Sequence, residues 1–135
     1  MKSVALTALA LIVSVGLASG NLSAYSDEDL QKLKTTGSCV RCDLSGAVLI
    51  HWNLSGANLS RADLTGANLT DAYMAGANLS GANLSNAILI SVSLAGANLR
   101  RAELAGANLL FTNVAGATWT DGSRCERDSS GHCRR

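Results

Sequence analysis

The sequence contains no proline, and its aromatic side chains are limited to two Trp, two Tyr and one Phe. Without large aromatic residues, a globular core of interlocking big side chains cannot be assembled. Neither sign of charge dominates, since 11 Lys and Arg face 10 Asp and Glu, which argues against a nucleic-acid binder with a basic surface and against an acidic mimic. Yet 47% of the 135 residues are hydrophobic, so one small domain must bury mainly Leu and Ala in a regular way.

The first residues have the pattern of a secretory signal peptide. Lys2 precedes an uninterrupted apolar or small stretch, residues 4–17, and residues 18–20 supply the small side chains that a signal peptidase recognises. A membrane anchor is the less favoured interpretation, because the stretch is shorter than the roughly 20 residues that span a bilayer. We expect cleavage after Gly20, with Ala24 as a second candidate site. The mature chain is then periplasmic or secreted and has no membrane span.

A period of five residues runs through residues 42–121. Among its sixteen blocks of five, the third residue, here called the centre, is always apolar and is Leu in thirteen. Two positions before the centre, the residue is Ala in twelve blocks. The four exceptions at this Ala-type position are Cys42, Trp52, Val92 and Thr112. Neither a helix nor a strand has this period, so it predicts a solenoid with a corner every five residues and with both positions facing inward.

The blocks at residues 57–61, 62–66 and 77–81 read ANLSR, ADLTG and ANLSG. They resemble the A(D/N)LXX signature of the pentapeptide repeat family, and the resemblance extends over residues 42–121. It implies an all-β solenoid, a right-handed quadrilateral β-helix of about four coils in which four blocks make one square coil. With its leader and its two end segments, the chain is similar to an exported bacterial member with a capping helix and a C-terminal cysteine loop.

Both ends carry segments that suit capping, which a solenoid needs because its end coils otherwise expose apolar side chains and unpaired backbone. Ser26 is followed by three acidic residues, which is typical of a helix start, and Gly37 is a typical helix stop. We expect a short helix over residues 27–35 that lays Leu30 and Leu33 on the first coil; a partner-binding helix is the alternative. The predicted organisation is a signal peptide (1–20), an N-terminal cap with a short helix (21–41), a pentapeptide repeat β-helix (42–121) and a C-terminal disulfide loop (122–135).

All four cysteines follow the leader, and an exported chain meets an oxidising compartment, so disulfides are expected. The two ends of the coil stack lie too far apart for a shared disulfide or a shared metal ion. Cys125 is therefore predicted to pair with Cys133 and close the C-terminal loop. Cys39 and Cys42 form either a local disulfide or two buried thiols. Redox catalysis is not expected, because this CxxC motif lacks a βαβ context.

No group of residues in the sequence predicts a catalytic, metal or cofactor site. His51 belongs to the first coil and His132 to the terminal loop, so they cannot cooperate within one molecule. The acidic residues of the repeat are scattered, which is typical of solvated turns. They are Asp43, Asp63, Asp71, Glu103 and Asp121. We therefore expect a protein that is not an enzyme and that uses no cofactor.

One side of the expected solenoid departs from the polar surface pattern. Positions 20 apart stack on neighbouring coils, and the outward positions around Leu49, Leu89 and Leu109 include apolar residues. The candidate interface residues are Val48, Ile50, Ile88, Ile90, Leu110 and Phe111. Such a strip marks either a contact with a protein partner or a second copy of the chain, or a surface covered by another part of the chain.

Two functional classes fit these observations. The favoured one is a non-enzymatic structural or protein-interaction scaffold exported to the cell envelope, whose biochemical role the sequence leaves unknown. The alternative, implied by some family members, is a DNA-mimicking topoisomerase-protection protein. A mimic needs a strongly acidic surface, whereas residues 42–121 hold five acids against Arg61, Arg100 and Arg101. These arginines form a small basic patch that we interpret as a solvated edge, and no nucleic-acid partner is expected.

Overall fold

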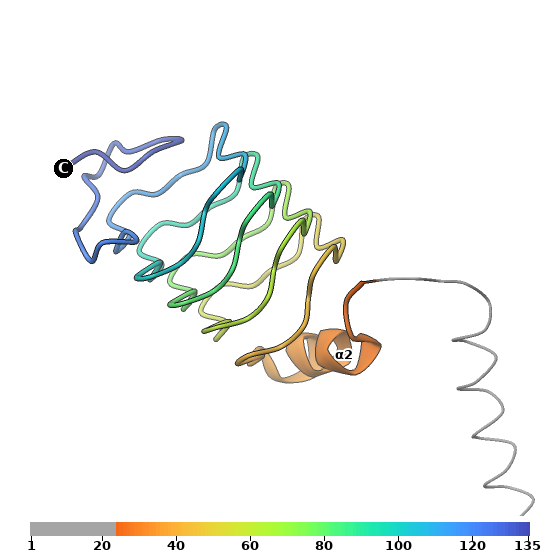
Figure 1. Ribbon diagram of the computed structural model, residues 1–135. Coiled ribbons are helices and arrows are strands. Elements are labelled where there is room, and N and C mark those ends of the chain that lie inside the picture. The colour runs from red at the N-terminus through yellow and green to blue at the C-terminus, as the bar shows by residue number, and fades with distance from the viewer. Residues whose placement is uncertain (1–23) are drawn as a thin grey trace, which may run out of the picture.

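The computed structural model describes residues 24–135. In this part of the chain one helix, α2 (Asp27–Thr36), is followed by a stack of coils that leads to the C-terminal segment (Figure 1). The predicted signal peptide, residues 1–20, lies outside the described residues. No helix in residues 24–135 is long and apolar enough to cross a membrane.

The chain returns to the same side of the stack every 20 residues. Thirteen parallel β-bridges each join two residues 20 apart, from Ser38–Asn58 to Asn98–Thr118. Successive bridge positions follow one another every five residues along the chain. Because a corner interrupts the backbone between them, the pairing within residues 24–135 consists of isolated bridges. No strand of several consecutive residues forms there, which the prediction of an all-β fold did not anticipate.

Every block turns its corner in the same way. The N–H of the Ala-type residue donates to the C=O of the preceding centre, as Ala47 does to Leu44 at 3.1 Å. The residue just before the Ala-type position, here called the corner residue, has a positive φ, 70° at Gly46 for example. Glycine adopts this conformation freely, but other residues incur a cost of about 1 kcal/mol. The non-glycine corner residues are Arg41, His51, Arg61, Asp71, Asn86, Ser91, Arg101 and Phe111.

The centres and the Ala-type positions fill the interior, as the repeat predicts. Leu44, Leu79 and Leu99 are fully buried, and so are most of the alanines between the centres. Full burial of one leucine side chain contributes roughly 1.5 to 3 kcal/mol. The last coil differs, because Leu104 and Leu109 are only partly buried.

The Asn or Asp before each centre has a structural task. Asn78 Oδ1 accepts from the N–H of Ser80 at 3.1 Å and from its hydroxyl at 2.7 Å. Asp63 accepts the same two bonds from Thr65 at 3.0 and 2.6 Å. These side chains thus hold the backbone in an Asx turn, which explains the abundance of small polar residues without a ligand.

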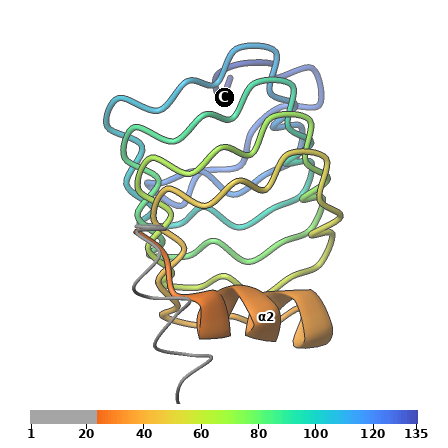
Figure 2. The ribbon, with the colours of Figure 1, turned by 90° about the vertical axis from the view of Figure 1, so that its right-hand side faces the viewer.

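Helix α2 lies across the N-terminal end of the coils (Figure 2). Ser26 caps its start, Gly37 ends it in the left-handed conformation, and it runs one residue beyond the predicted range. Leu33 is buried against the first coil. Asp29 Oδ2 accepts from the N–H of Asp43 at 2.8 Å, which ties the helix to the stack.

The C-terminal segment covers part of the other end. It runs antiparallel to the last coil, with the bridges Asn113–Ser130 and Thr118–Arg124. A disulfide joins Cys125 to Cys133, whose Cα atoms are 5.0 Å apart. At the opposite end a second disulfide joins Cys39 to Cys42, the pair for which the sequence left thiols as an alternative. The structure therefore places one covalent link beside each cap.

Candidate functional site

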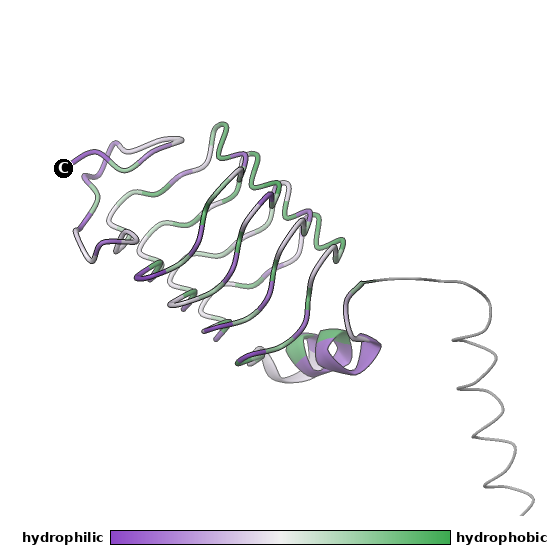
Figure 3. Ribbon diagram, viewed as in Figure 1, coloured by the Kyte–Doolittle hydropathy of each residue, from purple (hydrophilic) through white to green (hydrophobic). Residues whose placement is uncertain are grey.

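The apolar residues singled out in the sequence lie along one side of the stack. Bridges join Val48 to Asn68, Asn68 to Ile88 and Ile88 to Asn108, so these positions stack directly. Figure 3 shows hydrophobic segments recurring along one edge of the coils. We call the six predicted interface residues on this side the apolar column: Val48, Ile50, Ile88, Ile90, Leu110 and Phe111.

The apolar column consists of two separate groups. Asn68 and Thr70 stand between them, and the Thr70 hydroxyl donates to Asn68 Oδ1 at 2.6 Å. Of the C-terminal group, Leu110 and Phe111 are 54% and 68% exposed, whereas the two isoleucines are half-buried. Large apolar side chains this exposed beside one another are the kind of surface that marks an interaction site.

Phe111 is unusual in its backbone as well as in its exposure. It is a corner residue with a φ of 59°. A residue with a bulky side chain is strained in the left-handed region. An exposed phenyl ring also gains no stabilisation from burial. The other corner residues on this side, His51, Asp71 and Ser91, are polar. Neither backbone preference nor solvation therefore favours Phe111 at this corner.

The main chain near Phe111 is also open. On the two sides of the last coil that the cap covers, Val114 N donates to Ser129 O and Trp119 N to Ser123 O. On the other two sides, the N–H groups of Leu104 and Leu109 have no hydrogen-bond partner among the described residues. A cavity of about 490 Å³ lies between this edge and the cap. Its lining includes Leu110, Phe111, Gly131 and His132.

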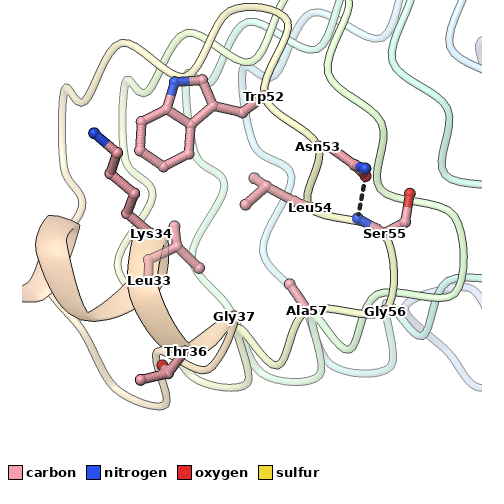
Figure 4. A pocket seen from close by; sticks show the side chains of 10 residues that line it. All are labelled: Leu33, Lys34, Thr36, Gly37, Trp52, Asn53, Leu54, Ser55, Gly56 and Ala57. Carbon is pink, nitrogen blue, oxygen red and sulfur yellow. Dashed lines mark hydrogen bonds between the residues drawn. The ribbon is translucent and has the colours of Figure 1, made fainter.

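A second cavity, of about 450 Å³, lies between α2 and the first coil, and we call it the α2 groove (Figure 4). Trp52 lines this groove and occupies an Ala-type position of the repeat. The structure accommodates the ring because Trp52 belongs to the first coil, where α2 takes the place of a preceding coil. The lining residues are Leu33, Lys34, Thr36, Gly37, Trp52, Asn53, Leu54, Ser55, Gly56 and Ala57. The sequence shows Trp52 as an exception to the Ala pattern, but it does not place the ring beside the helix.

The three arginines of the predicted basic patch lie together. Arg61, Arg100 and Arg101 surround Gly81 and Ser80, with a cavity of about 250 Å³ among them. All three are exposed, and none forms a salt bridge with a carboxylate in residues 24–135. The patch therefore fits the solvated edge that the sequence predicted.

The titratable groups do not assemble into a catalytic arrangement within the described part of the chain. His51 Nδ1 lies 3.9 Å from Asp71 Oδ2 on exposed corners, and His132 belongs to the C-terminal loop. Asp29 lies within 4.8 Å of both sulfurs of the Cys39–Cys42 pair. Because those sulfurs are bonded to each other, they offer no thiolates to a metal ion.

Asp121, at the end of the last repeat block, has a pKa below its ordinary value. Hydrogen bonds from the hydroxyl and the N–H of Ser123 lower the pKa of Asp121, with a smaller contribution from the Arg135 guanidinium. This is the same Asx turn that recurs along the repeat. The shift reflects turn geometry and carries no sign of acid–base chemistry.

The family model for pentapeptide repeats, which contains 8 copies of the repeat, matches residues 42–81 and 82–118. The chain belongs to the pentapeptide repeat family. A pentapeptide repeat protein from Nostoc Pcc 7120 is 37% identical over 68% of this chain and 78% of its own length, with a TM-score of 0.63. The family predicted from the sequence is thus confirmed.

Two further solved pentapeptide repeat structures have lower sequence identity to this chain. HetL, from the cyanobacterium Nostoc sp. strain PCC 7120 and involved in heterocyst differentiation regulation, is 33% identical over 64% of this chain and 51% of its own, with a TM-score of 0.43. QnrB1, a plasmid-mediated fluoroquinolone resistance protein, is 23% identical over 59% of this chain and 62% of its own, with a TM-score of 0.37. No curated protein matches the chain.

Proposed function

We propose that this pentapeptide repeat protein is a non-enzymatic scaffold of the cell envelope that binds another protein, or a second copy of itself, through the C-terminal group of the apolar column. The main observation behind this proposal is Phe111. Its side chain is 68% exposed beside the exposed Leu110, and its backbone has a strained positive φ. Aromatic side chains are the usual anchors of protein interfaces. The half-buried Ile88 and Ile90 extend the same surface by one coil.

The envelope location rests on two observations. The leader in residues 1–20 has a secretory pattern, and both disulfides are of the kind that persists in an oxidising compartment. A scaffold role rests on the surface, where Asn, Asp, Ser and Thr side chains are used for turns. We also infer that the solenoid is a right-handed quadrilateral β-helix of about four coils; the family and the 20-residue spacing of the bridges support this.

The alternative, a DNA-mimicking topoisomerase-protection protein, has weaker support. QnrB1 resembles this chain too distantly to carry an argument about activity. The five acidic residues of the repeat are spread over the coils, and three arginines gather on one edge. A surface of this kind lacks the dense negative field that imitates a phosphate backbone.

A double substitution tests the proposed interface. Ile90→Ser with Phe111→Ser should leave the fold intact, because neither residue is a centre, and should abolish self-association or capture of the partner. Tyr73→Ser is the matched control, since Tyr73 is 58% exposed on another side of the stack. Sedimentation velocity and pull-down from the native compartment provide the measurements. Unchanged association would refute the interface, and loss of folding would show that the surface is core.

A further inference from the structure

The α2 groove exposes main-chain hydrogen-bonding groups in its wall. Tyr73 in the second coil shows how this side of the stack is normally paired. Its N–H donates to the C=O of Trp52 at 2.9 Å, and its C=O accepts from the N–H of Leu54 at 2.7 Å, both in the first coil. Asn53 is the counterpart of Tyr73 in the first coil. Because α2 occupies this end of the stack, neither the N–H nor the C=O of Asn53 has a partner among residues 24–135. Both groups belong to one residue, so a single extended residue of another chain can satisfy them together.

The side chains of the groove add an apolar floor and a cation. Leu33, Leu54 and Ala57 are each at most 5% exposed and form the floor. In Figure 4 the side chains of Lys34 and Trp52 lie on the same side of the groove. Lys34 forms no ion pair with a carboxylate in the described chain. The groove thus offers a place for an apolar side chain beside a place for a negative charge.

The walls restrict what can occupy the groove. On one side α2 is fixed to the stack by Leu33 and by the bond between Asp29 and Asp43 N. On the other side runs the edge that contains Asn53. A second solenoid cannot approach this edge without displacing the helix, whereas one extended chain needs only the 4.7 to 4.9 Å, roughly, between paired strands.

We propose that the α2 groove binds an extended peptide segment of a partner protein by β-strand addition to Asn53. An apolar side chain of the peptide packs on Trp52 and Leu54, and a neighbouring carboxylate pairs with Lys34. The site differs from the proposed interface, because it lies at the α2 end of the stack, whereas Leu110 and Phe111 belong to the last coil. It also accounts for a tryptophan at an Ala-type position.

Selection of a random heptapeptide library displayed on phage against the purified protein tests the ligand class. We expect enrichment of peptides in which an apolar residue stands beside Asp or Glu. Synthetic copies of them should bind about tenfold more weakly to Trp52→Ala and to Lys34→Ala. Lys32→Ala is the matched control, because Lys32 belongs to the same helix but does not line the groove. Trp52→Ala introduces the residue that twelve of the sixteen blocks already carry, so folding, checked by circular dichroism, should persist.

Amide hydrogen exchange with an enriched peptide tests the strand addition itself. The N–H of Asn53 should exchange at least about tenfold more slowly in the complex. The N–H of Val48, which also has no partner in the described chain but lies outside the groove, should not change. The proposal is overturned if no peptide is enriched, if binding ignores both groove substitutions, or if Asn53 stays unprotected. The Ile90→Ser, Phe111→Ser variant should bind these peptides normally, which separates this site from the apolar column.

Discussion

At the scale of single residues, each position of the repeat meets a different physical demand. The centre is buried, the corner residue takes a positive φ, and the Asn or Asp side chain closes the turn. Because the demands differ, substitutions at adjacent positions should have very different effects on stability.

Leu79→Ala should lower the free energy of unfolding by roughly 2 to 5 kcal/mol, because it leaves a cavity at a fully buried centre. Asn78→Asp should change it little, since Asp63 already makes the same turn bonds at the equivalent position. Urea denaturation of both variants provides the measurement. Equal effects would mean that the centre does not belong to the interior.

Phe111→Asn should stabilise the fold by about 0.5 to 1 kcal/mol, because Asn tolerates the left-handed conformation far better than Phe. It should also weaken association through the apolar column. Leu110→Asn is the control, since Leu110 is similarly exposed but has no positive φ. It should weaken association without stabilising the fold, and the pair of variants therefore separates backbone strain from binding. A Phe111→Asn variant no more stable than Leu110→Asn would show that the corner is unstrained.

At the scale of elements, the two caps cover the ends of the stack only in part. Among residues 24–135, the N–H and C=O of Asn53 beside α2 have no partner, and neither do the N–H groups of Leu104 and Leu109 beside the C-terminal segment. Unpaired edges normally invite chains to stack on one another.

Replacing Cys125 and Cys133 by serine should loosen the C-terminal cap and destabilise the protein by about 2 to 4 kcal/mol. The N–H groups of Val114 and Trp119 donate to the cap and should lose protection from hydrogen exchange. The N–H of Leu79, in the middle of the stack, should keep its protection and serves as the internal control. Unaltered exchange at Val114 and Trp119 would show that backbone pairing alone holds the cap.

At the scale of the whole molecule, the chain is a rod of regular coils whose distinctive features lie at its ends. The α2 groove lies at one end, and Leu110 and Phe111 of the apolar column lie at the other. Between them the surface repeats the same turn chemistry. A scaffold that joins two partners would use this layout, with one partner bound at each end.

The leader makes a prediction about the whole molecule in its native host. The protein recovered from the envelope fraction should begin at Asn21, because residues 18–20 provide the small side chains that a signal peptidase requires. Intact mass spectrometry under non-reducing conditions measures both the new N-terminus and the two disulfides. An uncut N-terminus, or cysteines that react with an alkylating reagent, would contradict the proposed export.

The repeat phase, the buried centres and α2 could be predicted from the sequence. They follow from short-range physics, because a five-residue period, an N-cap at Ser26 and a stop at Gly37 act over a few residues. The stacking of the apolar column could also be predicted, because positions 20 apart lie on neighbouring coils once the coil length is known.

The tertiary structure alone decided which sides of the end coils are covered. Residues 123–131 and α2 lie outside the five-residue repeat. Where they dock depends on long-range hydrogen bonds that the repeat pattern does not encode. For the same reason the placement of Trp52 and Lys34 in one groove, together with the unpaired main chain of Asn53, could be found only from the folded structure. The positive φ of Phe111 likewise follows only from the folded backbone, because half of the corner residues are glycine and the other half are not.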